Sequence, residues 1–214
     1  MKLFFKTLSV LLMLINPTLS KDLVEIFNFA KDDISKLKSH SIKKKTDYKI
    51  IELNGEKILE AKAKGQASGL GKELKVNLNK TPILNITWKV KQGLPGINED
   101  TKKGHDFAAR VSVIKETGSL PWQKNVMNYV FSSNKKTNSH WVGPYRKQIH
   151  DYVASSLVDS DTDTWVTVKL NVKKHFKEFF DKDYNEIDGV AIMTDTDNSK
   201  KMAVSYYKEI YFSD

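Results

Sequence analysis

Apolar and polar residues alternate along much of this sequence, and this period of two constrains the fold more than any other feature. Within residues 83–92 (ILNITWKVKQ), Ile86 and Trp88 share one side, and the residues between and beside them are polar. Residues 106–115 (DFAARVSVIK) repeat the pattern. Because successive side chains of an extended strand point to opposite faces, such segments predict strands with one buried face. Comparable segments occur at 47–54, 57–64, 73–79, 126–132, 148–155, 164–172, 187–195 and 202–212.

This pattern predicts a mainly β protein built as a two-sheet sandwich. Clusters of Gly, Asn, Pro and Lys separate the segments, and neither a repeat nor an interdomain linker interrupts them. Residues 21–214 are therefore expected to form a single β-sandwich domain. One short helix is expected at about 172–181 (VKKHFKEFF and the next residue), where Val172 and Phe176 recur at helical spacing. The first segment after residue 22 fits either a helical stripe or a strand.

Residues 1–20 have the layout of a cleavable secretory signal peptide. Lys2 and Lys6 precede a short apolar run, and small residues lead up to Ser20. The alternative is a membrane anchor, but residues 3–15 number only 13, and a spanning helix needs about 20. The chain contains no Cys, so neither a lipid-attached lipoprotein nor a disulfide is expected. We expect a periplasmic or secreted protein without a transmembrane segment in its mature chain.

The basic charge of the chain is weak support for a polyanionic partner. There are 35 basic and 26 acidic residues, a net charge of +9. Only Arg110 and Arg146 are arginines, however, and bidentate recognition of phosphate favours Arg over Lys. Most of the lysines are therefore expected to be solvated surface residues, and nucleic acid is not expected as a partner.

One acidic cluster resembles the start of a calcium-binding loop. Asp159, Asp161 and Asp163 alternate along the chain, but Thr164 stands at the glycine position and Leu170 at the position of the bidentate Glu. In an extended strand, residues i and i+2 lie roughly 6.6 Å apart, so only a curled loop brings the three carboxylates together. A solvated turn is the simpler interpretation. Calcium at this position is a weak alternative, and no other cofactor is expected.

A second polar cluster follows an apolar strand near the C-terminus. Asp195, Asp197 and Asn198 stand where that strand emerges, and Asp106 and Arg110 lie on one side of another predicted strand. Asp and Asn often hydrogen-bond to their own turn, and Arg110 offers a partner for an ion pair. These five residues are interpreted either as a structural brace or as a site for a ligand or a metal.

The sequence contains no recognisable catalytic motif, so no catalytic residues are predicted. Aromatic residues are the remaining lead, because a flat ring can stack on a sugar. Trp88 and Trp165 lie inside strands and are expected in the core, whereas Trp122 and Trp141 lie beside Pro or Gly and are expected to be exposed. Trp122 and Trp141 are therefore added to the candidate ligand-binding residues.

Several segments together resemble the bacterial domain-of-unknown-function family 3047. The most specific are DFAARV at 106–111 and AIMTDTDN at 191–198. The others are VEIFNF (24–29), TDYKIIELNGEKILEAKAKGQASGLGKEL (46–74), TPILNITWKVKQG (81–93), NYVF (128–131), NVKKHFKEFF (171–180) and YYKEIYF (206–212).

The resemblance implies an exported protein with a jelly-roll-like antiparallel sandwich, similar to galactose-binding-like and carbohydrate-binding modules. It also implies that residues 24–29 form a strand. It supplies no catalytic residues, because no activity is established for the family. Two departures stand out: His105 replaces the first of an acid pair, and Phe131 replaces a Trp. If that acid pair binds a cation or ligand, binding is expected to be weaker here.

Three functions are compatible with the sequence. The first is a non-catalytic binding module for envelope or extracellular carbohydrate. The second is a structural or assembly protein of the cell envelope, with the acidic residues and Arg110 as braces. The third is a hydrolase or lyase acting on polysaccharide. Whether the polar cluster is open to solvent or sealed inside the fold separates the first of these from the second.

Overall fold

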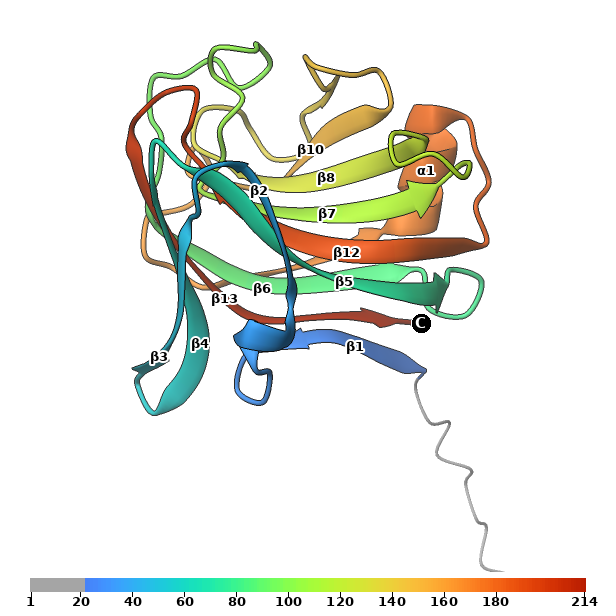
Figure 1. The fold of residues 1–214 in the computed structure, drawn as a ribbon, viewed down its shortest axis with the longest axis horizontal. Helices are drawn as coiled ribbons and strands as arrows, with labels where there is room; N and C mark the ends of the chain where they lie inside the picture. Colours follow the sequence, from blue (N-terminus) through green and yellow to red (C-terminus); the bar gives the residue numbers. More distant parts are fainter. Residues whose placement is uncertain (1–21) are drawn as a thin grey trace, which may run out of the picture.

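Residues 22–214 form two β-sheets packed face to face in a computed structural model (Figure 1). The expected signal peptide, residues 1–20, lies outside the described residues. The six-stranded sheet has the order β11 (Val166–Asn171), β6 (Ile83–Gln92), β13 (Met202–Ser213), β4 (Glu56–Lys64) and β3 (Asp47–Leu53), with β1 (Leu23–Asn28) also paired to β13. The seven-stranded sheet has the order β2 (Lys38–Lys43), β5 (Ala67–Asn77), β12 (Glu186–Asp195), β7 (Ala109–Glu116), β8 (Lys124–Ser132), β10 (Ile149–Ser156) and β9 (His140–Val142).

The alternation predicted from the sequence supplies the core between the two sheets. Trp88 of β6, Tyr129 of β8 and Tyr207 of β13 are almost fully buried there, and the Trp88 indole N–H donates to Ser155 Oγ at 2.9 Å. Within β7, Val111 belongs to this core, whereas the alternate residues belong to the opposite, outer face of the sheet. The mainly β, jelly-roll-like sandwich is therefore confirmed.

The structure corrects the expected strand pairing and settles the ambiguous N-terminal segment. The sheets are not wholly antiparallel, because β8 and β10 pair in parallel. The chain between them returns along the sheet edge and forms β9 on the way, so β10 starts at the same end as β8. The ambiguous N-terminal segment is a strand, β1, and a short 3-10 helix follows at Ile34–Lys36.

Trp165 is not a core residue, which corrects the sequence expectation. It is half-buried and packs with a small apolar cluster that includes Ile58, Val204 and Tyr206, separate from the main core. The ammonium of Lys89 lies 5.2 Å from the centre of the Trp165 ring and 2.7 Å from Asp163 Oδ1. A Trp placed just before a strand can thus cover a lysine on the outer face of the sheet as well as fill a core.

The predicted helix is α1 (Val172–Phe180), which buries Val172 and Phe176. The Asn171 side chain caps it by accepting from the Lys174 N–H at 2.9 Å, and the left-handed Asp181 ends it. Of the helices in residues 22–214, none has the length and apolar character required to cross a bilayer.

Candidate functional site

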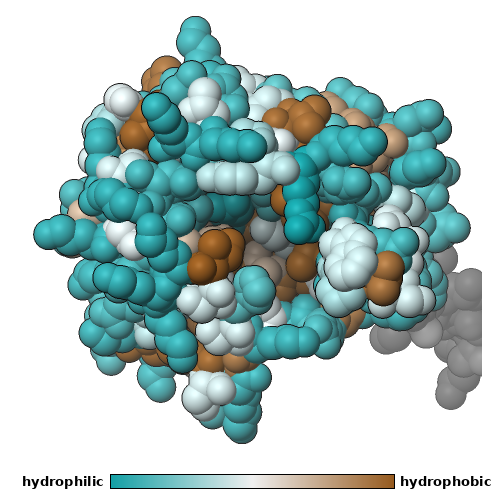
Figure 2. Space-filling model, turned by 45° about the horizontal axis from the view of Figure 1, so that its top comes forward, coloured by the Kyte–Doolittle hydropathy of each residue, from teal (hydrophilic) through white to brown (hydrophobic). Residues whose placement is uncertain are grey.

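A hollow of about 250 Å³ opens on the outer face of the seven-stranded sheet, near the end of β12 and the start of β7. The hollow is lined by polar residues from strands and loops that are far apart in the sequence. Figure 2 shows a hollowed region with hydrophobic atoms in an otherwise mainly hydrophilic face. The residues that line the hollow are Ile42, His105, Arg110, Asn128, Tyr145, Arg146, Ile149, Asp195, Asp197 and Asn198.

Arg110 and Asp195 form a buried ion pair at this hollow. The pairing of β7 with β12 places Arg110 opposite Met193, two residues before Asp195. Tyr207 holds these strands from the other sheet: its hydroxyl accepts from the Arg110 backbone N–H at 3.1 Å and donates to Met193 O at 3.0 Å. A buried polar contact therefore fixes the backbone from which the guanidinium projects.

Burial and the mutual attraction of Arg110 and Asp195 shift the pKa of each residue in opposite senses. Burial alone would lower the pKa of Arg110, but the nearby charge of Asp195 and its contact outweigh burial and raise the pKa. Burial raises the pKa of Asp195 above its ordinary value, against the opposing effect of Arg110. A carboxylate and a guanidinium in this setting offer planar sets of acceptors and donors beside the hollow.

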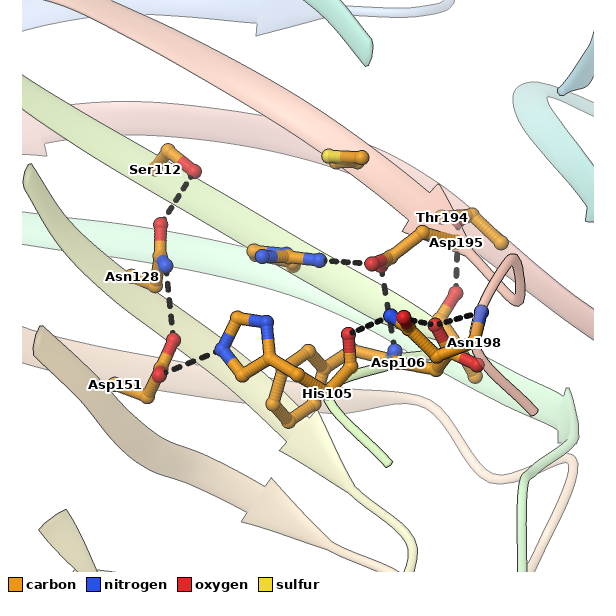
Figure 3. Close-up of polar contacts among 12 residues, drawn as sticks. His105, Asp106, Ser112, Asn128, Asp151, Thr194, Asp195 and Asn198 are labelled. Atoms are coloured by element: carbon orange, nitrogen blue, oxygen red, sulfur yellow. Dashed lines mark hydrogen bonds and ion pairs between the residues drawn. The ribbon is translucent and has the colours of Figure 1, made fainter. Parts of the chain in front are cut away.

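A chain of hydrogen bonds runs beside the ion pair (Figure 3). Ser112 Oγ donates to Asn128 Oδ1 at 2.7 Å, and Asn128 Nδ2 donates to Asp151 Oδ1 at 2.8 Å. His105 Nε2 lies 2.8 Å from Asp151 Oδ2. Burial opposes ionisation of Asp151, but the hydrogen bond and charge of His105 and the charge of Arg110 prevail and lower its pKa. His105, which replaces an acid expected from the family resemblance, is therefore the partner of a buried carboxylate.

Sequence reasoning missed Asn128 and Asp151 as part of this site. The available signal was local: Asn128 stands between Met127 and Tyr129, and Asp151 precedes Tyr152 and Val153. A polar side chain beside such apolar residues in a strand needs a hydrogen-bond partner when it is buried. Tyr145 and Arg146 were also missed, and they lie in the loop between β9 and β10 with no motif around them. Only the fold brings that loop to the hollow.

Asp106, a predicted site residue, is sealed inside the fold. It is fully buried and accepts from the backbone N–H of Asn198 at 3.1 Å, from Asn198 Nδ2 at 3.0 Å and from the Ser199 N–H at 2.5 Å. Figure 3 shows Asp106 beside Asn198, and Asn198 lies on the turn that follows β12. The interpretation as a structural brace therefore fits Asp106, whereas Arg110, Asp195, Asp197 and Asn198 line the hollow.

The acidic residues at the hollow are poorly suited to hold a cation. Oxygen atoms of Asp106, Asp195 and Asp197 lie within 4.8 Å of one another, the only such group among residues 22–214. The Asp106 oxygens already accept from the turn, and Asp195 accepts from the Phe107 N–H at 3.3 Å and pairs with Arg110. A bound cation would have to displace these donors and lie close to a guanidinium.

The structure does not assemble Asp159, Asp161 and Asp163 into a group suited to a metal. Asp159 accepts from the Thr137 backbone N–H at 2.7 Å, and Asp163 pairs with Lys89. Asp161 is exposed in the turn between them. The geometry agrees with the interpretation as a solvated turn.

The two candidate tryptophans lie in different places. Trp122 is 60% exposed, as expected, but belongs to the β7–β8 connection at the far end of β7 from Arg110. At about 3.3 Å per residue, the strand separates it from the hollow by roughly 20 Å. Trp141 is not freely exposed, contrary to expectation: it is half-buried and stacks on Phe107 with 6.4 Å between ring centres. It belongs to a small cluster with Val130 and Val153.

A larger recess of about 460 Å³ lies beside the start of α1, away from these residues. Its basic side chains are surface lysines, and Lys173 Nζ already pairs with Asp183 at 3.4 Å. It contains none of the predicted site residues, so the smaller hollow is the better candidate.

The fold and the hollow define a β-sandwich protein with a polar recess on the outer face of its larger sheet. The chain belongs to the family described as protein of unknown function DUF3047, whose model matches residues 34–211. This confirms the resemblance noted from the sequence. No curated protein matches the sequence.

Two solved structures illustrate what the fold is similar to. One is the family 11 carbohydrate-binding module of the cellulosomal cellulase Lic26A-Cel5E of Clostridium thermocellum, at 10% identity and a TM-score of 0.46 over 90% of this chain and 94% of that one. The other is the family 30 carbohydrate-binding module of the cellulosomal cellulase Cel9D-Cel44B of the same organism, at 11% identity and a TM-score of 0.49 over 89% and 96%. Such low similarity does not transfer a ligand, so function has to be inferred from this chain's own side chains.

Proposed function

We propose that this protein is a non-catalytic binding module that recognises one hydroxyl-rich sugar unit of an envelope or extracellular carbohydrate at the hollow beside Arg110 and Asp195. The observation that carries the proposal is the convergence of planar hydrogen-bonding groups on one small recess: two guanidinium groups, two carboxylates and two amides. Such groups offer paired donors and acceptors, which adjacent sugar hydroxyls can match.

An aromatic ring at the rim adds an apolar surface. Tyr145 is 51% exposed, and its hydroxyl lies 3.0 Å from Asn198 Oδ1 and 2.9 Å from Lys102 O. These contacts hold the ring beside the hollow, where one face of a sugar ring can pack against it. A few fixed polar groups next to an apolar surface are typical of small-ligand sites.

The size of the hollow favours a single unit. Its volume of about 250 Å³ is below the roughly 300–1,000 Å³ of most small-molecule pockets. A chain of sugars would therefore place one unit in the hollow and the rest outside it.

A binding role accounts for the carboxylates better than catalysis does. Glycoside hydrolysis uses two carboxyl groups that flank the scissile bond, one of them free to donate a proton. Asp106 is sealed and satisfied, and Asp195 is paired with Arg110. Export, expected from residues 1–20, would give the module access to envelope and extracellular polysaccharides.

The test is binding of the exported protein to a glycan array and to purified peptidoglycan and acidic polysaccharides. The wild type should bind at least one glycan, and the double variant Tyr145→Ala/Asn198→Ala should bind it at least tenfold more weakly. Trp122→Ala is the matched aromatic control at the far end of β7 and should bind as the wild type does. Uniform silence, or equal binding by the double variant, would overturn the proposal.

A further inference from the structure

The two arginines of this chain line the same hollow. Arg110 and Arg146 are the only arginines among 35 basic residues, and both border the recess of about 250 Å³. All the other basic residues of the chain are lysines. A planar guanidinium differs from an ammonium chiefly in its ability to make two parallel hydrogen bonds to a carboxylate or phosphate.

Arg110 has more donors than its neighbours accept. Its side chain is only 8% exposed, and its Nη2 pairs with Asp195. The Nε and Nη2 groups are both buried, and neither makes a hydrogen bond of good geometry among the described residues. A guanidinium carries five N–H donors, and buried donors are normally matched. The neighbouring groups therefore leave this arginine, which borders the hollow, with donor capacity for an additional acceptor.

Arg146 complements Arg110 from the rim. It is exposed, lies in the loop after β9, and joins no ion pair within residues 22–214. Its side chain is therefore free to turn toward a ligand. The hollow thus has one guanidinium fixed by an ion pair and one exposed guanidinium without a carboxylate partner among the described residues, a combination suited to an anionic group.

The acidic residues of the hollow determine what kind of anion is acceptable. Asp195 is matched by Arg110, but Asp197 is a further carboxylate in the same recess. A compact, multiply charged anion such as phosphate or sulfate would be repelled by it. A ligand with a single carboxylate at one end and hydroxyls at the other suits both sets of groups, because hydroxyls donate to carboxylates.

We propose that the hollow takes a sugar unit that carries a carboxylate, a uronic acid residue of an acidic polysaccharide. The carboxylate lies against Arg110 and Arg146, and the ring hydroxyls face Asp197 and Asn198. This inference rests on the proposed function and specifies its ligand class.

The experiment compares acidic oligosaccharides with their own methyl esters by isothermal titration calorimetry. Oligomers of glucuronic, galacturonic and mannuronic acid are each measured beside the ester, which keeps every hydroxyl and removes the charge. At least one acid should bind tenfold or more tightly than its ester. Arg146→Gln should reduce that ratio to within about twofold, and Lys147→Gln, which removes the same charge from the next exposed residue, should leave it intact.

The outcomes separate this inference from the proposed function. If neutral glycans or the esters bind as well as the acids, or if Arg146→Gln preserves the preference, the acidic ligand class is overturned while carbohydrate binding stands. If neither these oligomers nor any glycan on the array binds, both proposals fail. Since Arg146 is an exposed loop residue, its replacement is not expected to unfold the protein.

Discussion

Asp106 and Asn198 are joined by two hydrogen bonds, in which the backbone and side-chain amides of Asn198 both donate to Asp106 Oδ1, at 3.1 and 3.0 Å. Asp106 is fully buried, whereas Asn198 lies at the hollow. Asp106 therefore cannot contact a ligand itself and influences binding only by positioning Asn198. This relationship divides the predicted polar cluster into a buried support and a recess open to solvent.

Replacing Asp106 should destabilise the protein more than replacing its half-buried neighbour Asp197. Asp106→Asn exchanges an acceptor of three N–H groups for an amide with donors of its own. We expect a loss of about 2–3 kcal/mol in the free energy of unfolding, measured by urea denaturation. The half-buried Asp197, changed to Asn, is the control and should cost no more than about 0.5 kcal/mol. Equal losses for the two variants would contradict the assigned brace.

Removal of Arg110 should leave a buried charge without its partner. Arg110→Met is expected to lower the free energy of unfolding by about 3–5 kcal/mol, because Asp195 is only 3% exposed. The double variant Arg110→Met/Asp195→Leu removes both charges and should cost less than Arg110→Met alone. Chemical denaturation is measured for the wild type, the single variants Arg110→Met and Asp195→Leu, and the double variant. A double variant as unstable as the sum of the two single variants would show that the residues do not interact.

The protein should lose stability on acidification through His175. Its pKa is lowered to about 4 from 6.5, chiefly by burial, and its Nδ1 lies 3.1 Å from Tyr129 Oη. Between these two pH values the unfolded chain binds more protons than the native one, so stability is full above pH 6.5 and falls toward pH 4. The loss attributable to His175 is on the order of 3 kcal/mol.

The measurement is urea denaturation at pH 7 and pH 4.5 for the wild type and His175→Gln. The wild type should lose more stability between these pH values than the variant does. His140 and His150, whose pKa values burial also lowers, act in the same direction, while the raised pKa of Asp195 acts in the opposite one. The difference between the two proteins isolates His175, and identical pH profiles would refute its role.

The tryptophans Trp141 and Trp122 should differ in their contribution to stability. Trp141→Ala removes a ring that stacks on Phe107 and should cost roughly 2 kcal/mol, less than a fully buried Trp because it is half-exposed. Trp122→Ala should change the free energy of unfolding by less than about 0.5 kcal/mol, because the side chain is 60% exposed. Thermal unfolding compares the two. A larger loss for Trp122 would be inconsistent with the described packing.

Parts of the site were predictable because their signals are local. Arg110 and Asp195 each lie on a strand whose alternation is visible, and both were predicted as members of one polar cluster. Asp151 and Tyr145 were not, because their position depends on the parallel pairing of β10 with β8 and on the loop that precedes it. A loop of this kind carries no period, and parallel pairing cannot be read from alternation, which is the same in both directions.

The amino-acid sequence by itself determined the mainly β fold, the short helix α1 and the chemical character of the polar cluster, since periodicity and residue type are local properties. Only the tertiary structure decided that Asp106 is sealed while Asp195 faces a recess, that Trp141 is partly covered, and that both arginines lie at one hollow. Burial and convergence arise from contacts between residues far apart in the chain, and a carboxylate at a strand end has the same local pattern in either setting.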